Sequence, residues 1–328
     1  MKSPKREVIP VFFAVDDNYA PLLFVAIESL VSQASKAYEY HIHVLCDSLS
    51  DANKDILYTY EKRYLKSPKY PRRVKVFITD MAARIAARAD QMHTRDYYSK
   101  TTYFRIYIPG MFPEYHKALY LDCDITLNGD ISQLYNFDIG DNYVGAVTCE
   151  AVDRIQVFTE YAEKYLGLKL PHYFNAGVLV MNLDEWRSRR LEERFFDIMS
   201  KVKFEVAQDQ DYLNVLCQGK TQYLPKVWNK IPMPLNGLTE ADVKLVHYNL
   251  AFRPWRYDNV LYGDLFWKHA KKTAVYERLL EMKRGFTEKD AAGDAQWMER
   301  LKRMACELSA AAETFCTQIK SGKIVLIK

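Results

Sequence analysis

The sequence predicts an α/β fold with a mostly parallel sheet between layers of helices, and two observations lead to that prediction. Short apolar stretches typical of buried strands alternate along the chain with stretches typical of helices. Acidic pairs follow two of the apolar stretches, at the strand ends where parallel sheets bind ligands. At 328 residues the chain is long enough for one large domain or for two smaller ones.

The expected strands are VIPVFFAV (8–15), YHIHVLCD (40–47), VKVFITD (74–80), KALYLDCD (117–124) and YVGAVTC (143–149). A helix over 21–33 has Pro21 in its first turn, where a missing N–H costs nothing. Ser50 and Asp51 suit the cap of a second helix that runs to about residue 64. A helical turn over 103–109 is expected to end at Pro109. The alternation of strands and helices implies βα units, whose strands pair in parallel.

Charge and cysteine content exclude several classes of protein. Residues 1–267 carry 33 Lys and Arg against 34 Asp and Glu, whereas residues 268–328 carry 13 against 8, so no basic face for nucleic acid covers the main body. The six Cys residues form no CxxC pair, which indicates neither a zinc site nor a disulfide framework. Asp16 and Asp17 interrupt the first apolar stretch, unlike a signal peptide, and no apolar stretch reaches membrane-spanning length. We therefore expect a reduced, cytoplasmic protein.

The stretch ALYLDCDITLNGDISQLY (118–135) places Asp122 and Asp124 two residues apart at the end of an apolar strand. Residues at this spacing share one face of a strand, so the two carboxylates would repel each other unless a cation lay between them. Asp16 and Asp17 also follow a strand, and the carboxyl ends of parallel strands meet at one edge of a sheet. The sequence therefore predicts a divalent metal site at that edge, with a solvated acidic turn as the alternative.

A third ligand is predicted in VKLVHYNLAFRPW (243–255), where His247 again follows an apolar run. Carboxylate oxygens suit Mg²⁺ or Mn²⁺, and an added imidazole nitrogen favours Mn²⁺. Arg253 lies six positions further on and is suited to a phosphate group. Together these residues describe a metal that bridges a diphosphate. The alternative for His247 is a structural histidine in the core.

Five stretches in a fixed order make the chain recognisable: FAVDDNYA (13–20), TTYFRIYIP (101–109), LYLDCDITLNGDISQLY (119–135), FNAGVLVMNLDEWR (174–187) with QDQDYLN (208–214), and HYNLAFRPW (247–255). On these motifs the chain resembles the retaining glycosyltransferases of family 8. That family includes bacterial lipopolysaccharide galactosyl- and glucosyltransferases and, more distantly, glycogenin. The resemblance covers the body from about residue 10 to residue 267, and it implies a catalytic domain over 1–267 with a helical, basic extension over 268–328.

The resemblance implies a GT-A, Rossmann-like fold that transfers galactose or glucose from a UDP-sugar to a glycan, glycolipid or glycoprotein. It implies that Asp122, Asp124 and His247 bind Mn²⁺, with Mg²⁺ as the alternative, and that Asp16, Asn18 and Tyr19 hold the uridine. Arg105, Asp209 and Gln210 are implied as catalytic residues around the donor sugar. The remaining implied donor-binding residues are Ala14, Asn175, Ala176, Leu250 and Arg253. The oligomeric state is left open.

The last motif departs from the family pattern His-x-x-Gly-x-x-Lys-Pro-Trp, because Leu250 replaces the Gly and Arg253 replaces the Lys. Arg253 can still hold a phosphate, but Leu250 would keep the backbone further from a diphosphate. A non-catalytic relative that binds nucleotide sugars therefore stays an alternative. A sugar-1-phosphate nucleotidyltransferase is disfavoured, because DDNYAPLLF lacks the Gly-rich loop with Arg and Lys that such enzymes need after the first strand.

The C-terminal extension is expected to contain a long helix over about 294–318. Its apolar residues recur at spacings of three and four: Trp297, Leu301, Met304, Leu308, Ala311 and Phe315. One interpretation is that this stripe packs on the catalytic body or on a second copy of the chain. The other is that the helix lies on anionic lipid at the inner face of the membrane, with its basic residues toward the headgroups. On the second interpretation, removal of the chain from about Gly293 onward would leave turnover of the donor intact.

Overall fold

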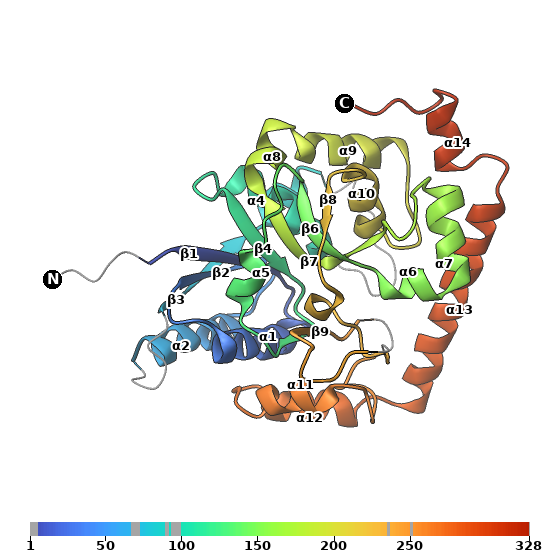
Figure 1. Cartoon of the computed structure of the whole chain (residues 1–328). Coiled ribbons are helices and arrows are strands. Elements are labelled where there is room, and N and C mark those ends of the chain that lie inside the picture. Colours follow the sequence, from blue (N-terminus) through green and yellow to red (C-terminus); the bar gives the residue numbers. More distant parts are fainter. Residues whose placement is uncertain are drawn as a thin grey trace.

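The computed structural model describes residues 6–66, 73–88, 92, 100–234, 237–249 and 252–327. Within these ranges a seven-stranded sheet forms the centre of the protein (Figure 1), and a two-stranded sheet accompanies it. In spatial order the large sheet contains β3 (Arg73–Asp80), β2 (Glu39–Cys46), β1 (Val8–Ala14), β4 (Lys117–Leu121), β7 (Phe174–Asn182), β6 (Val144–Thr148) and β8 (Thr221–Tyr223). The small sheet pairs β5 (Ile125–Leu127) with β9 (Leu245–His247).

The large sheet is mostly parallel, which confirms the predicted fold class. β1 runs parallel to β2 and β4, β2 runs parallel to β3, and β6 runs parallel to β8. β7 is antiparallel to both of its neighbours, β4 and β6. It is not among the strands predicted from the sequence, although its residues FNAGVLVMN are buried along almost their whole length.

Helices cover both faces of this sheet (Figure 1). The helices drawn below it are α1 (Ala20–Gln33), α2 (Asp51–Lys66), α11 (Gly263–Ala270) and α12 (Tyr276–Arg284). Those drawn above it are α4 (Ile108–Met111), α8 (Leu183–Ser188), α9 (Leu191–Lys201) and α10 (Asp209–Leu216). The shorter elements are α3 (Ala82–Ala86), η1 (Lys100–Tyr107), α5 (Ile131–Tyr135), α6 (Glu150–Arg154), α7 (Gln156–Glu160), η2 (Tyr161–Tyr165) and η3 (Lys226–Trp228). α13 (Glu288–Ala310) and α14 (Phe315–Lys320) run along one side of the molecule, where α13 packs against α7 and η2.

The strands of the sheet supply side chains to a core on each face. Along β1, Val11 and Phe13 enter the core shared with α1, whereas Phe12 between them enters the core on the opposite face. This alternation is the two-residue period of a strand, and the run VIPVFFA is apolar throughout because both faces are covered. At the end of β1, Asp17 accepts hydrogen bonds from the Ser50 N–H and the Asn53 amide, both at 2.7 Å, so its carboxylate joins β1 to the start of α2.

The sequence had suggested that Pro109 ends a helical turn, but Pro109 lies in the first turn of α4. η1 leads directly into α4 at residue 108, and a proline in a first helical turn loses no hydrogen bond. The helical segment therefore continues to Met111, where Phe112 ends it.

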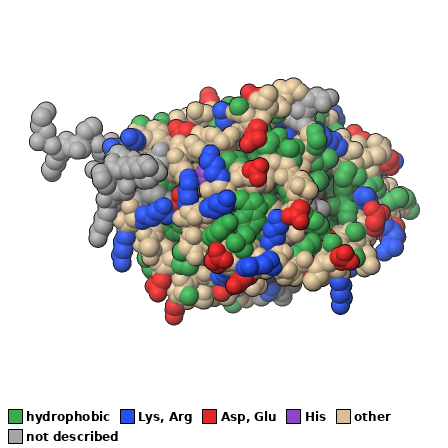
Figure 2. Space-filling view, turned by 90° about the horizontal axis from the view of Figure 1, so that it is seen from below, with side chains coloured by type: hydrophobic (Ala, Val, Ile, Leu, Met, Phe, Trp, Pro, Cys, Tyr) green, Lys and Arg blue, Asp and Glu red, His purple; other side chains and the backbone are tan. Residues whose placement is uncertain are grey.

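The helices of the described residues fall short of the requirements of a membrane span, and one face of the surface shows how the charges are distributed. Among the helices of the described residues, none combines the length and the apolar character needed to cross a bilayer. On the face shown in Figure 2, basic and acidic side chains are interspersed around a central group of hydrophobic ones.

Two helices, α13 and α14, occupy the part of the C-terminal extension where a single helix over 294–318 was expected. α13 begins at Glu288, because Thr287 and Asp290 form a capping box, and it ends at Ala310. Thr314 caps α14 in the same way. Most of the predicted apolar stripe packs on the rest of the protein. Trp297, Leu301 and Phe315 are buried in the core that also contains β7, Met304 and Leu308 pack partly against it, and Ala311 is exposed. The division into 1–267 and 268–328 as separate units stays a prediction.

A buried carboxylate connects three elements of this core. Asp211, in the first turn of α10, accepts hydrogen bonds from the hydroxyls of Tyr161 in η2 (2.9 Å) and Tyr173 just before β7 (2.6 Å). It also accepts the N–H of Ala207 at 2.9 Å. Burial raises the pKa of Asp211 to about 6, although these hydrogen bonds favour the charged form.

The raised pKa of Asp211 predicts that the protein loses folding stability as this carboxyl ionises, and that Asp211→Asn does not show this loss. A folded-state pKa above the ordinary value of 3.8 stabilises the fold below pH 4, and this contribution is lost as the pH rises through about 6. The difference in unfolding free energy, variant minus wild type, should therefore increase by on the order of 3 kcal/mol between pH 4 and pH 6. Urea denaturation at a series of pH values measures the difference, with Asp264→Asn as an exposed control. A difference that does not change with pH would contradict the prediction.

Candidate active site

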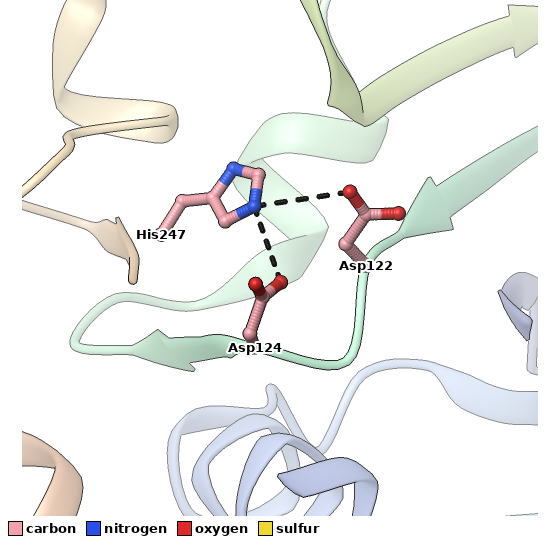
Figure 3. A group of neighbouring side chains, drawn as sticks. All are labelled: Asp122, Asp124 and His247. Carbon is pink, nitrogen blue, oxygen red and sulfur yellow. Dashed lines mark ion pairs between the residues drawn. The ribbon is translucent and has the colours of Figure 1, made fainter. Parts of the chain in front are cut away.

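Asp122, Asp124 and His247 meet at one edge of the large sheet (Figure 3). His247 Nε2 lies 3.8 Å from Asp122 Oδ2 and 3.2 Å from Asp124 Oδ1. One ligand atom from each side chain can be chosen so that all three atoms lie within 4.8 Å of one another. The sequence had suggested that both acids lie on a strand. β4 ends at Leu121, however, so the two acids lie in the bend between β4 and β5. The antiparallel pairing of β5 with β9 places His247 opposite Ile125, directly after Asp124.

Neighbouring side chains orient the two ligands that face each other across the site. Asp122 Oδ1 accepts hydrogen bonds from the Tyr120 hydroxyl (2.9 Å) and from Arg105 Nη2 (3.1 Å), which leaves Oδ2 toward His247. His247 Nδ1 lies 3.0 Å from Asn229 Oδ1, so Nδ1 donates there and Nε2 faces the carboxylates. A metal-ligating histidine usually has such an acceptor on its second nitrogen. Asn229 was not predicted from the sequence, because it lies just after η3 and far from every motif.

The backbone of β7 comes so close to this group that only glycine fits. A Cβ on Gly177 would lie 2.3 Å from His247 Cε1 and 2.5 Å from Asp122 Oδ2. The Gly177 carbonyl also accepts the N–H of Asp122 at 2.8 Å, which holds the first acid against β7. The glycine of FNAGVLVMN therefore leaves the space in which the two ligands meet.

The electrostatics of the three side chains fit a divalent cation. Burial opposes a charge on His247, but Asp124 and Asp122 raise the pKa of its ring above the ordinary value. Burial would raise the pKa of Asp124, but the His247 ring and the Arg253 guanidinium hold that pKa below the ordinary value. The pair of carboxylates thus favours positive charge at the position of the ring. A divalent metal would satisfy the same demand and displace a proton from His247.

Arg105 is the most constrained cation of the site. It is 3% exposed, its guanidinium lies 4.1 Å over the Tyr120 ring, and it donates to the carbonyls of Thr102 and Ala176. Its Nη2 lies 3.5 Å from Asp209 Oδ2 as well as 3.1 Å from Asp122 Oδ1. Burial raises the pKa of Asp209 to about 6, and the charge of Arg105 opposes that rise.

Gln210 is held at both ends of its side-chain amide. Its Oε1 accepts the N–H of Ala176 at 3.0 Å, and its Nε2 donates to the Tyr173 hydroxyl at 3.2 Å. Gln208, the residue before Asp209, has a φ of 45° and a ψ of −116°, a strained conformation for a residue with a side chain. This sharp entry into α10 turns both Asp209 and Gln210 toward the cavity.

A cavity of about 240 Å³ brings most of the predicted site residues together. Its lining includes Ala14, Asp16, Tyr19, Arg105, Asp122, Asp124, Asn175, Ala176, Asp209, Gln210, His247 and Arg253. Asp16 Oδ1 accepts the N–H of Tyr19 at 3.0 Å, which sets the turn between β1 and α1. Asn18 is exposed and is not part of this lining, so its role in binding uridine stays a prediction. Leu250 lies outside the described residues.

The lining of the cavity also includes a group of apolar side chains that the sequence did not predict. These side chains come from α6, α7, the approach to α10 and α13: Val152, Phe158, Val206, Trp297 and Leu301. Trp297 and Leu301 belong to the C-terminal extension, so α13 contributes to the wall of the cavity as well as to the core.

Comparison with known proteins agrees with this geometry. The family described as glycosyl transferase family 8 matches residues 10–259. A Haemophilus influenzae protein whose name assigns it to the glycosyltransferases is 29% identical over 69% of this chain, which spans 64% of that protein's length. An Escherichia coli lipopolysaccharide 1,2-glucosyltransferase is 26% identical over 81% of this chain and 79% of its own. The crystal structure of the galactosyltransferase LgtC with donor and acceptor sugar analogues is 26% identical, with a TM-score of 0.63 over 81% of this chain and 96% of its own. The fold is thus that of the GT-A glycosyltransferases, and the chain belongs to glycosyl transferase family 8.

Proposed function

We propose that the protein is a metal-dependent retaining hexosyltransferase that moves galactose or glucose from a UDP-sugar to a glycan, glycolipid or glycoprotein. The observation that carries the proposal is the convergence of Asp122, Asp124 and His247 on a cavity that also contains Arg105, Asp209 and Gln210. A site that only bound a nucleotide would have no use for a buried carboxylate and a doubly held amide beside the metal ligands.

We assign the uracil, the diphosphate and the hexose of the donor to different residues that line the cavity. Tyr19 would stack on uracil and Asp16 would accept from its N–H, because both lie beside the metal ligands at the end of β1. Arg253 lines the same cavity and would neutralise the diphosphate. A bound Mn²⁺ would supply Lewis-acid stabilisation of the charge that develops on the leaving UDP. Arg105, Asp209, Asn175 and Gln210 would surround the hexose.

The contacts of the carboxylates favour attack on the same face from which UDP departs. A covalent intermediate needs a nucleophilic carboxylate, but Asp209 is next to Arg105 and Asp211 already accepts three hydrogen bonds. Gln210 carries an amide, which is a poor nucleophile. In same-face attack, the departing phosphate takes the proton of the acceptor hydroxyl, and the protein contributes position and charge.

We propose that the enzyme works in the cytoplasm with peripheral contact to the membrane, and two observations support this location. All six cysteines are unpaired, which suits a reducing cytoplasm. Near the C-terminus, Val325 and Ile327 are 69% and 48% exposed and follow Lys320 and Lys323. The stripe of α13 is buried in the core, so we assign peripheral contact with anionic lipid to these terminal residues and not to that stripe.

A panel of nucleotide sugars tests the proposed activity. With Mn²⁺, the wild type should release UDP from UDP-galactose or UDP-glucose and should leave GDP-mannose and ADP-glucose intact, because Tyr19 and Asp16 read uracil. UDP should also raise the melting temperature more than GDP or ADP. Equal responses to all three diphosphates would remove these residues from a uridine site, and turnover of none of the sugars would contradict the proposal.

Variants of the three ligands test the metal. Asp122→Asn, Asp124→Asn and His247→Ala should each lower Mn²⁺-stimulated UDP release by more than about 100-fold, and Asn229→Ala by about 10- to 100-fold. Circular dichroism should show that each stays folded, and the exposed Asp141→Asn should match the wild type. Wild-type turnover that survives a chelator would end the metal assignment.

Vesicle sedimentation tests the membrane contact. The full-length protein should bind phosphatidylserine vesicles at low salt and dissociate from them as the salt concentration rises, because the attraction is electrostatic. Val325→Asp with Ile327→Asp should abolish this binding and leave UDP release unchanged. Equal binding by the wild type and this variant would exclude the terminal residues as the anchor.

A further inference from the structure

Arg253 depends on a short turn for its position. Its carbonyl accepts the N–H groups of Arg256 and Tyr257, both at 2.9 Å, so the residues at the two ends of the turn are tied together. Arg253 is 7% exposed, lines the cavity, and lowers the pKa of Asp124 through its charge. The turn is therefore the element that brings the Arg253 guanidinium into the cavity, near Asp124.

One carboxylate of the C-terminal extension holds the far end of that turn. Asp294, in α13, accepts hydrogen bonds from Arg256 Nη1 at 3.1 Å to each of its oxygens, and from the Tyr257 hydroxyl at 2.9 Å. It is 7% exposed, so these contacts are shielded from water. Phe286 packs beneath the same two residues, 5.3 Å from the Arg256 guanidinium and 4.9 Å from the Tyr257 ring.

We propose that Asp294 is a positioning residue of the diphosphate site, which it supports by fixing Arg256 and Tyr257 and, through them, Arg253. The proposal rests on the proposed function, because it assigns the diphosphate to Arg253. It extends the site beyond the segment that matches the family, which ends at residue 259. Loss of the Asp294 charge would weaken the hydrogen bonds that fix Arg256 and Tyr257, and the turn that carries Arg253 would no longer be held in one position.

The same reasoning contradicts the expectation that the chain from Gly293 onward is dispensable for turnover. Removal of that segment removes Asp294, together with the wall that Trp297 and Leu301 contribute to the cavity. The truncated protein should lose affinity for the donor even where it stays folded.

Calorimetric titration with a ligand pair provides the test. Wild type, Asp294→Asn, Arg253→Gln and the double variant, all full length, are titrated with UDP and with uridine in the presence of Mn²⁺. Asp294→Asn should weaken UDP binding about tenfold, which corresponds to about 1.4 kcal/mol, and should leave uridine binding unchanged. The double variant should bind UDP no more weakly than Arg253→Gln, because both substitutions remove the same contact.

Thr287→Ala is the matched control, because it breaks the capping box of α13 and removes no charge from the surroundings of Arg256. If it weakens UDP binding as much as Asp294→Asn does, the effect comes from the stability of the helix and the proposal is wrong. Unchanged UDP binding in Asp294→Asn, an equal loss for uridine, or losses that multiply in the double variant would also overturn it. These results leave the proposed function intact, whereas a wild type that does not bind UDP would end both.

Discussion

Two carboxylates and one imidazole ring meet where β4 leaves the sheet, and much of the site is arranged around that contact. Asp122 and Asp124 are close enough to repel each other, and each is offset by a different cation. Arg105 lies against the first acid, and Arg253 lowers the pKa of the second. His247 faces both because β9 pairs with β5 in a fixed register. Gly177 permits this approach, since any side chain on it would fill the space where the ligand atoms meet.

From this group the contacts lead outward in two directions. One passes from Arg105 to Asp209 and then along α10 to Gln210 and Asp211, whose partners Tyr161 and Tyr173 join η2 and β7. The other passes from Arg253 through its turn to Asp294 of α13. α13 also packs on α7 and η2, and its residues Trp297 and Leu301 line the cavity. The extension is thus part of the frame of the cavity.

The sequence predicted those features that depend on local pattern. Apolar runs identified β1, β2, β3, β4 and β6. The spacing of Asp122 and Asp124, together with His247, identified a group of side chains that could hold a metal ion. β7 escaped prediction because an antiparallel strand buried on both faces has no period of its own, and its partners lie far away in the chain. Asn229, Gly177 and Asp294 escaped for a related reason. Each acts through contacts with residues 18 or more positions away in the chain, and a local pattern does not reveal such contacts.

The central claim is that Asp122, Asp124 and His247 form a site for one divalent cation, with a nitrogen among its ligands. Pulsed electron paramagnetic resonance of Mn²⁺ bound to the full-length protein with UDP tests this claim most directly. Coupling of the manganese electron spin to a ring nitrogen should be present in the wild type, should change when the histidines carry ¹⁵N, and should be absent in His247→Gln. Bound Mn²⁺ without nitrogen coupling, or coupling that persists in His247→Gln, would contradict the account.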